Sequence, residues 1–394
     1  MINIFNMSRS EWMSATQALA HLGVRPQTLY AYASRGRVEV RPDPEAPRRS
    51  QYRTADVEML AARKGRSRKH ADVASEAIAW GEPVLASAIT AVRVGRLYYR
   101  GYDAVQLAEG HSLEVVARLL RAAGDALAET APRPAPPEVA DLRQRLFHAL
   151  ADRAATAPPM LGSSAAACAD EAEAVLQIVA DAVIGVAVPG EAIHERLART
   201  WGADPRGPSA DIIRRMLVLV ADHELNASTF AARVTASTGA SLAASVLAGL
   251  TALSGPRHGG LSVVVQRFAA EARAYGAGAA VRHRLIEGRQ LPGFGHALYP
   301  EGDIRAKAVL EAIEIPPLFT EIRDTAKDSA DAEPNIDFAM VAACSACGFP
   351  EEAPFAVFAV ARTAGWIAHA LEQAQSSQLI RPRARYTGPE PAFG

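Results

Sequence analysis

The sequence predicts a mainly α-helical protein, and both composition and hydrophobic periodicity support this fold class. Alanine is abundant among the 394 residues, whereas aromatic residues make up only 6% of the chain. Both features favour helices over strands. Apolar residues recur at helical spacing in six stretches, residues 113–123, 137–154, 164–187, 209–223, 228–239 and 240–254. A chain of this length can bury a large core and holds about two to three domains.

Charge divides the chain into two parts. The whole sequence has a net charge of −1. Residues 1–70 contain 13 Lys and Arg against 6 Asp and Glu, a net charge of +7, and the remainder carries −8. This asymmetry predicts two modules with different partners.

The basic N-terminal part has the pattern of two short helices and a hairpin. Residues 14–22 show helical spacing, and Gly23 is expected to end that helix. Pro26 suits the first turn of a second helix over residues 27–34. Two short helices joined by a glycine turn describe a helix-turn-helix. A short hairpin with a basic tip is expected over residues 37–53, followed by a helix over residues 55–62 that Thr54 caps.

Residues 12–63 resemble the winged helix-turn-helix of the mercury-resistance-regulator and excisionase type. The resemblance lies in residues 18–24, 28–32, 34–36 and 52–57. In such proteins the second helix enters the major groove of DNA and the wing contacts the backbone. The resemblance therefore implies DNA-binding roles for Gln27, Thr28, Tyr30, Arg35, Arg48 and Arg49. The alternative is a basic helical appendage used for dimer contacts or docking.

Targeting and cysteine patterns favour a cytoplasmic protein. The first 12 residues lack a long apolar core, so secretion is not expected. No apolar run of about 18 residues is evident, so no membrane span is expected. Three cysteines form no disulfide framework, which favours a reducing compartment. Cys344 and Cys347 match C-x-x-C, a pattern of zinc and redox sites, but two small residues of a buried helix are the simpler interpretation and no metal is expected.

Two histidines and an aspartate suggest the chemistry of the acidic part. His258 and His296 lie in glycine-rich turns, and Asp337 follows in Pro-Asn-Ile-Asp-Phe. Glycines beside each histidine let a substrate approach the backbone closely. Two hydrogen-bond donors and a carboxylate base suit the removal of a proton next to a carbonyl.

Residues from about 82 to 388 resemble the citrate synthase family, because eight motifs occur in order. They are residues 99–103 (Tyr-Arg-Gly-Tyr-Asp), 222–230 (Asp-His-Glu-Leu-Asn-Ala-Ser-Thr-Phe), 255–260 (Gly-Pro-Arg-His-Gly-Gly), 292–296 (Pro-Gly-Phe-Gly-His), 303–306 (Asp-Ile-Arg-Ala), 335–338 (Asn-Ile-Asp-Phe), 361–366 (Ala-Arg-Thr-Ala-Gly-Trp) and 381–388 (Arg-Pro-Arg-Ala-Arg-Tyr-Thr-Gly).

This resemblance implies the citrate synthase fold, with large and small helical domains. The expected organisation is a winged helix-turn-helix domain at 1–65, a basic linker at 66–81, a large domain at 82–259 and 359–394, and a small domain at 260–358. It also implies a homodimer or larger assembly with shared active sites. The implied reaction condenses acetyl-CoA, a substrate rather than a cofactor, with oxaloacetate and hydrolyses the citryl thioester.

The resemblance also implies residue roles. Asp337 is the base, His258 donates a hydrogen bond to the thioester oxygen, and His296 polarises the ketone and protonates the alkoxide. Oxaloacetate is expected to bind to His223, Arg305, Arg362 and Arg381, the last of which reaches from the other subunit. The adenine of CoA is expected to bind to the turn formed by Leu291, Pro292, Gly293, Phe294 and Gly295. His369 is more simply a packing or surface residue.

Alternatives remain open for both function and donor. Ala339 and Met340 stand where citrate synthases commonly have Tyr-Ser, which leaves room beside Asp337 for a longer acyl group. A 2-methylcitrate synthase that uses propionyl-CoA is therefore an alternative. A third hypothesis is a DNA-binding regulator that senses acyl-CoA or oxaloacetate without turnover.

Overall fold

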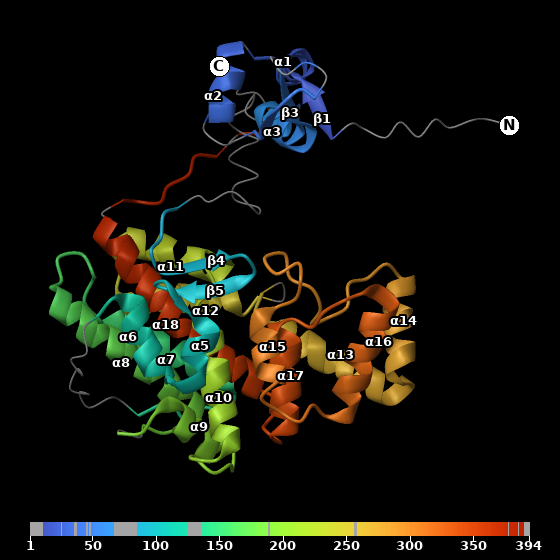
Figure 1. Cartoon of the computed structure of the whole chain (residues 1–394). Helices are drawn as coiled ribbons and strands as arrows, with labels where there is room; N and C mark the ends of the chain where they lie inside the picture. Colours follow the sequence, from blue (N-terminus) through green and yellow to red (C-terminus); the bar gives the residue numbers. More distant parts are fainter. Residues whose placement is uncertain are drawn as a thin grey trace. The chain divides into compact units, whose positions relative to one another are not determined.

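The computed structural model describes two compact units. The described residues are 11–24, 26–34, 38–44, 46, 49–66, 85–123, 135–187, 190–255, 258–376, 378–384 and 386–389. The smaller unit comprises Met1–Ala86 with Arg383–Gly394, and the larger unit comprises Ser87–Pro382 (Figure 1). Each unit is described by itself.

In its described residues, the smaller unit contains a three-stranded antiparallel sheet and three helices. The elements are β1 (Trp12–Ser14), α1 (Ala15–Leu22), α2 (Pro26–Ser34), β2 (Val40–Pro42), β3 (Ser50–Arg53) and α3 (Thr54–Arg66). β3 is the central strand, because Tyr52 pairs with Met13 on one side and Val40 on the other. The sequence predicted the β2–β3 hairpin and missed β1, which is only three residues long.

Local chemistry explains the helix boundaries of the smaller unit. Ser14 and Gln17 form a capping box at the start of α1. Gly23 ends α1 with φ 58°, a left-handed conformation that favours glycine. A small core of Ala18, Leu22, Leu29, Val38, Tyr52 and Val57 holds the helices against the sheet. Helix α3 begins at Thr54, one residue before the expected start, and continues past the expected end at Ala62 to Arg66.

The proposed DNA-contacting residues are only partly described. Thr28 is half-buried on α2, and Arg49 is exposed before β3. The main-chain N–H of Asp43 donates to the carbonyl of Arg49 over 2.8 Å and closes the β2–β3 loop. Arg35 and Arg48 lie outside the described residues, as do the side chains of Gln27 and Tyr30.

The larger unit begins with a small sheet of β4 (Thr90–Arg93), β5 (Arg96–Tyr99) and β6 (Tyr102–Asp103) in that order. The predicted hairpin around Gly95 is confirmed. Val94 and Gly95 both have positive φ, 50° and 68°, as a tight two-residue hairpin turn requires.

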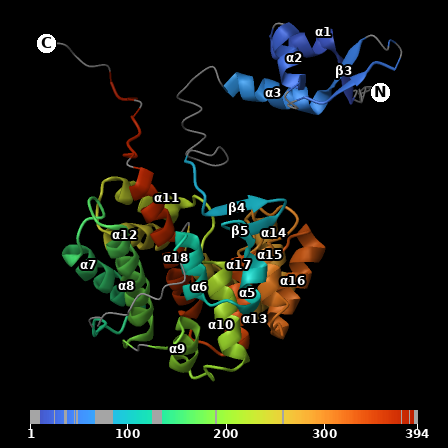
Figure 2. The same ribbon diagram turned by 60° about the vertical axis from the view of Figure 1, so that its left-hand side comes forward.

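Helices make up the rest of the larger unit, so the prediction of a mainly helical fold is confirmed (Figures 1 and 2). They are α5 (Ala104–Gly110), α6 (Leu113–Arg121), α7 (Leu142–Thr156), α8 (Ala165–Ile184), α9 (Ile193–Thr200), α10 (Pro208–Leu219), α11 (Ala227–Ser237), α12 (Leu242–Leu253), α13 (Leu261–Tyr275), α14 (Ala277–Ile286), α15 (Ile304–Leu310), α16 (Pro317–Ala330), α17 (Ile336–Ala346) and α18 (Ala353–Ser376). The stretches predicted from periodicity correspond to α6, α7, α8, α10, α11 and α12. They did not include α13 to α16, or α5 and α9, which are only 7 and 8 residues long.

Two hydrophobic cores lie within the larger unit, and α17 contributes to both. One face of α17 packs in the larger core through Ile336, Ala339, Met340 and Ala343. The opposite face packs against α13, α14 and α16 through Phe338, Val341 and Ala342. Because helical neighbours recur every three to four residues, these two sets form two stripes of one helix. Asp337, at the start of α17, therefore lies where the two cores meet.

Helix α18 is the central helix of the larger core. Among the helices the structure describes, it alone has the length and apolar composition to cross a membrane. However, 89% of its apolar window is buried within the protein, as expected of a helix that is apolar on all sides and packed in a core.

Candidate active site

The turn between α10 and α11 carries His223 into a cluster of aromatic rings. Its side chain is only 8% exposed. Its Nε2 lies 2.9 Å from the Tyr299 hydroxyl, and its ring centroid lies 5.1 Å from that of His296 at 81°. Burial lowers the pKa of His223 well below its usual value, and the charges of Arg305 and Arg362 lower it further. His223 is therefore neutral at physiological pH.

Several hydrogen bonds fix this turn. The Glu224 carboxylate accepts the main-chain N–H of Val92 over 2.9 Å. The Tyr99 hydroxyl lies 3.3 Å from the main-chain nitrogen of Asp222 and 3.2 Å from its carbonyl oxygen. Asn226 caps α11. Glu224 also has φ 51°, a strained conformation for a residue other than glycine. Such strain persists only where the surrounding structure holds it, and it is concentrated at functional sites.

The second histidine, His296, follows a turn that pairs with the segment before α17. Phe294 forms a β-bridge with Pro334, and the main-chain N–H of Asn335 donates to the carbonyl of Gly293 over 2.8 Å. Gly293 has φ 83°, and a Cβ there would lie 2.8 Å from the Cβ of Phe338. This pairing brings His296 and Asp337 to one place although 40 residues separate them in sequence.

The turn also contains all five residues expected to bind CoA. Leu291 and Gly293 are buried, Pro292 and Phe294 are half-buried, and Gly295 is exposed. The amide of Asn335 donates to the carbonyl of Gly295 over 3.1 Å. The turn is thus held by hydrogen bonds to the segment before α17.

Asp303 connects Arg305 to the start of α17. Its carboxylate accepts two hydrogen bonds from Arg305, at Nε (2.9 Å) and Nη2 (2.8 Å). It also accepts the main-chain N–H of Ile336 over 3.0 Å. Burial lowers the pKa of Arg305, but the Asp303 carboxylate outweighs this effect and raises it above its usual value. Arg305 is therefore a fixed cation beside Asp337.

Asp337 is suited to act as a base. It is half-buried in the first turn of α17. Burial raises its pKa to about 6, although the cations Arg305 and Arg362 oppose the shift. A carboxylate with this pKa is ionised at neutral pH and is a stronger base than an exposed aspartate.

His258 forms a trio with His296 and Asp337. It lies just before α13 and contacts Ser228. Its Nε2 is 2.8 Å from the Ser228 hydroxyl oxygen, which also accepts the Trp366 indole N–H over 3.2 Å. The hydroxyl proton has two possible acceptors, His258 and the Asn226 side-chain oxygen at 2.7 Å. When it is donated to His258 Nε2, the ring proton lies on Nδ1 and is free for a ligand.

Both half-buried histidines are neutral donors rather than cations. Burial lowers the pKa of His258 to about 4, with a further contribution from Arg362. Burial and Arg305 lower that of His296 to about 4. The main-chain N–H of Leu298 donates to His296 Nδ1 over 3.1 Å. The ring proton of His296 is therefore on Nε2.

Arg362 is a buried cation on α18, with 2% of its surface exposed. Its Nε donates to the carbonyl of Val220 over 3.0 Å, and its guanidinium lies 4.6 Å from the Phe358 ring centroid. Burial lowers its pKa, and the Asp222 carboxylate opposes the shift. A buried cation of this kind needs an anion to compensate for its lost hydration.

The structure thus groups six of the seven residues expected to act on substrates. They are His223, His258, His296, Arg305, Arg362 and Asp337, joined by the contacts and charge effects above. Arg381 lies on the exposed segment after α18 and, in the described part of the chain, makes none of those contacts. Tyr299 and Asp303 were not expected as site residues, although both stand within three residues of an expected one.

The two residues expected to make room for a longer acyl group lie in the larger core. Ala339 and Met340 are 0% and 2% exposed. Because α17 turns by about 100° per residue, Ala339 lies on the far side of the helix from Asp337, whereas Met340 lies about 60° from it on the same side. Of the two, Met340 is therefore the side chain that can influence the space beside Asp337.

The C-x-x-C pair lies near the end of α17. Cys344 is buried in the larger core, Cys347 is half-buried, and both are free thiols. Across the described ranges, no group of three or more His, Cys, Asp or Glu side chains is arranged to hold a metal ion.

Comparison with known proteins gives a consistent family. The family model described as "Citrate synthase, C-terminal domain" matches residues 78–383. Citrate synthase 2 of Bacillus subtilis is 36% identical over 200 residues, which are 48% of this chain and 54% of that protein. 2-Methylcitrate synthase 2 of Corynebacterium glutamicum is 33% identical over 210 residues, which are 49% and 55% of the two chains. The chain thus spans about half the length of these curated relatives.

A solved structure extends the similarity over the larger unit. The citrate synthase of Thermoplasma acidophilum, in a ternary complex with carboxymethyl coenzyme A and oxaloacetate, superposes with a TM-score of 0.65. The two chains are 25% identical, and the match covers 79% of this chain and 96% of that one.

Proposed function

Because the chain belongs to the citrate synthase family, we propose that its larger unit condenses acetyl-CoA with oxaloacetate and water to give citrate and CoA. The observation that carries this proposal is the meeting of a raised-pKa carboxylate with two neutral histidines, beside two buried arginines. This set provides a base, two oxyanion donors and a dicarboxylate site.

The proposed chemistry uses each group once. Asp337 removes a proton from the acetyl methyl group while His258 donates a hydrogen bond to the thioester oxygen. The resulting enolate, stabilised by the hydrogen bond from His258, attacks the ketone carbon of oxaloacetate, and His296 gives its Nε2 proton to the alkoxide that forms. Water then hydrolyses the citryl thioester to give citrate and CoA. Proton transfer by a placed group contributes about 10²–10⁴-fold, and an oxyanion donor about 10²–10³-fold. Both are needed, because a thioester methyl group is a very weak acid.

Binding of oxaloacetate is assigned to the buried cations. Arg305 and Arg362 would each hold a carboxylate, since the planar guanidinium matches it geometrically. His223 would donate a further hydrogen bond. We also propose a homodimer in which Arg381 completes the partner's site, consistent with its exposure in the single chain. The turn at 291–295 would hold the CoA adenine.

Thiol release tests the proposal. Purified full-length protein is mixed with oxaloacetate and either acetyl-CoA or propionyl-CoA, and free CoA is measured with a thiol reagent. Faster release from acetyl-CoA supports the citrate synthase assignment. Faster release from propionyl-CoA would favour the second candidate, a 2-methylcitrate synthase, which the similarity to the Corynebacterium glutamicum enzyme supports. Release with neither, in a protein that binds CoA, would favour a non-catalytic regulator.

For the smaller unit we propose a winged helix-turn-helix that binds DNA. Support comes from the +7 charge of residues 1–70 and from the order α1, Gly23 turn, α2 and the β2–β3 hairpin. Retention on DNA should fall steeply as salt is raised, because phosphate contacts release counterions. Lack of binding to any DNA at about 50 mM salt would reject this assignment.

We keep two further proposals. The three free thiols are consistent with a cytoplasmic location. The two separate hydrophobic cores support a large domain at 82–259 and 359–394 and a small domain at 260–358.

A further inference from the structure

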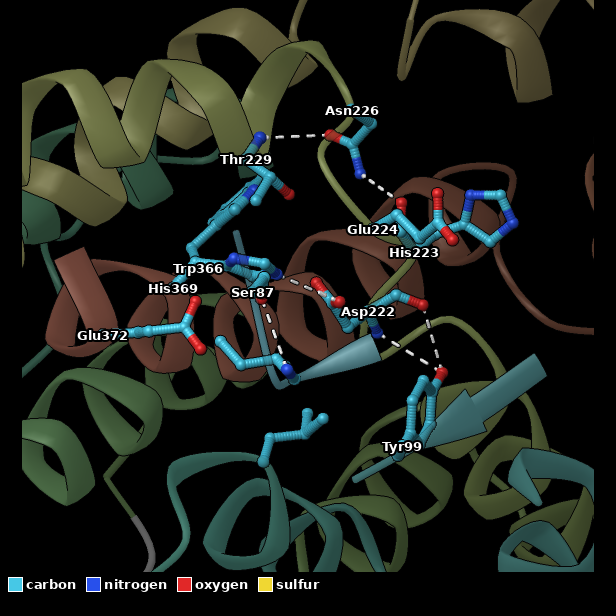
Figure 3. A network of polar contacts seen from close by, with 12 residues as sticks. Ser87, Tyr99, Asp222, His223, Glu224, Asn226, Thr229, Trp366, His369 and Glu372 are labelled. Carbon is cyan, nitrogen blue, oxygen red and sulfur yellow. Dashed lines mark hydrogen bonds and ion pairs between the residues drawn. The ribbon is translucent and has the colours of Figure 1, made fainter. Parts of the chain in front are cut away.

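A chain of buried polar side chains lies behind His223. Asp222 and His369 are 0% exposed and Arg233 is 3% exposed. His369 Nε2 lies 3.2 Å from the Asp222 carboxylate, and His369 Nδ1 lies 3.2 Å from Arg233 Nη1. Figure 3 shows His369 reaching Asp222 while the adjacent His223 ring points away from that carboxylate. His369 is therefore neither a surface residue nor simple apolar packing.

The direction of these hydrogen bonds follows from their chemistry. An arginine can only donate, so His369 Nδ1 accepts from Arg233. The ring proton is then on Nε2, which donates to Asp222. The histidine thus has one fixed tautomer between a cation and an anion.

Asp222 depends on this partner. Its other carboxylate oxygen, Oδ1, is buried and makes no close hydrogen bond with the described residues. Burial raises the pKa of Asp222, but His369, Arg362 and the Thr90 side chain together outweigh burial and lower it. A fully buried carboxylate that loses its hydrogen-bond donor becomes strongly unfavourable. Without His369, we therefore expect Asp222 and the adjacent backbone to move.

Close packing transmits such a movement to the site. Gly365 of α18 lies against the turn, and a Cβ at this position would be 2.4 Å from Asp222 Oδ1. The N–H of Gly365 donates to the carbonyl of Ala221 over 3.1 Å. Asp222 is therefore packed directly against α18, and a shift of its carboxylate would be felt by the turn. His223 is the next residue.

Arg233, the last of these buried polar side chains, is also held in place. Arg233 donates to Glu372 (2.8 Å) and to Gln373 (3.0 Å), both on α18. Glu372 accepts the main-chain N–H of Ala88, near the start of the larger unit, over 2.8 Å. Arg233 is therefore held from two sides and presents Nη1 to His369 in a fixed position.

We propose that His369 and Arg233 are positioning residues for the oxaloacetate site, which hold Asp222 so that His223 keeps its place against Tyr299 and the dicarboxylate. The proposal rests on the proposed function. Neither residue would touch substrate. Their effect would appear as weaker binding of oxaloacetate, since misplacement of a contact group by about 1 Å can cost up to roughly 100-fold.

Kinetics of His369 variants of the full-length protein test this proposal. We expect His369→Leu, which removes both hydrogen bonds, to raise the KM for oxaloacetate about tenfold or more. The KM for acetyl-CoA should change less. His369→Gln should restore most of the affinity, because its amide N–H can reach Asp222 from nearly the Nε2 position.

A matched control separates positioning from stability. Arg196 and Asp181 form another buried ion pair in the larger unit, at 2.6 Å with side chains 1% and 3% exposed. Arg196→Met should lower Tm to a similar extent and leave the KM for oxaloacetate unchanged. An equal rise of that KM in Arg196→Met, or no rise in His369→Leu, would overturn the proposal.

A second readout does not depend on turnover. Histidine-selective NMR of the ligand-free protein reports the ring of His223 and its contact with Tyr299. We expect its resonances to shift in His369→Leu and to return in His369→Gln. If the wild-type protein releases no CoA, the proposed function fails while this measurement still decides the positioning role. Unshifted His223 resonances in His369→Leu would contradict it.

Discussion

The two halves of the candidate site differ in burial. His223, Arg305 and Arg362 form a floor that is 8%, 2% and 2% exposed. His258, His296 and Asp337, the reacting trio, are only half-buried. In the floor, His223 is hydrogen-bonded to Tyr299, Arg305 to Asp303, and Arg362 to the carbonyl of Val220.

This difference separates binding from reaction. Groups fixed in a desolvated floor need no reorganisation when a dicarboxylate binds, which is the condition for strong electrostatic stabilisation. In the trio, His258 precedes α13, His296 lies in the loop before α15, and Asp337 lies in the first turn of α17. Their partial exposure is what a thioester would need to reach them. Mutations in the trio should therefore change kcat, whereas mutations in the floor should change the KM for oxaloacetate.

The largest effect is expected at Asp337. Asp337→Asn removes the base and keeps the shape, so kcat should fall by about 10²–10⁴-fold. Binding of oxaloacetate, measured by calorimetry, should persist because the floor is intact. A kcat within a few-fold of wild type would remove Asp337 from this role.

A smaller effect is expected in the floor at Arg362. Arg362→Leu deletes a buried charge-assisted contact, which is worth about 1.5–3 kcal/mol, so the KM for oxaloacetate should rise by about 10–100-fold. The decrease in kcat should be the lesser effect. If kcat falls by several orders of magnitude with KM unchanged, the division between floor and trio is wrong.

The pH dependence sharpens the same contrast. Because the pKa of Asp337 is raised to about 6, kcat/KM should fall about tenfold per pH unit below 6. The contribution of Asp337 to folding stability has the opposite dependence on pH. The folded state disfavours the ionised carboxylate, so this group destabilises the fold increasingly as pH rises from its unfolded pKa through 6. Asp337→Asn should raise Tm at pH 8 and have little effect near pH 4, which a pair of calorimetric scans can check.

The smallest effect is expected at Gly365, behind the floor. The Cβ of Gly365→Ala would meet Asp222 Oδ1 at 2.4 Å and the carbonyl of Ala221 at 2.6 Å. Overpacking of this kind costs about 1–3 kcal/mol, and it should appear as a lower denaturation midpoint. Gly288→Ala provides a contrast, because open space surrounds that position and its positive φ of 67° leaves only backbone strain. Equal losses for both would show that contact with Asp222 is unimportant.

Short motifs that resemble those of one family predicted the trio and the floor arginines, whereas the residue types alone suggested only carbon-acid chemistry for the trio. They could not predict Tyr299 as the partner of His223, because the two are 76 residues apart and meet only through folding. His369 shows the same limit. Its place on an apolar helix indicated packing, whereas its partners Asp222 and Arg233 come from other elements, 147 and 136 residues away.

The sequence by itself determined the mainly helical class, the glycine turns and the identity of the chemical groups, because these depend on local propensity and residue type. Only the tertiary structure decided their protonation and exposure. Burial raises the pKa of Asp337 and lowers those of His258 and His296. The packing of α17 places Ala339 and Met340 in the larger core. Burial depends on which distant segments pack together, and residue type alone does not specify that packing.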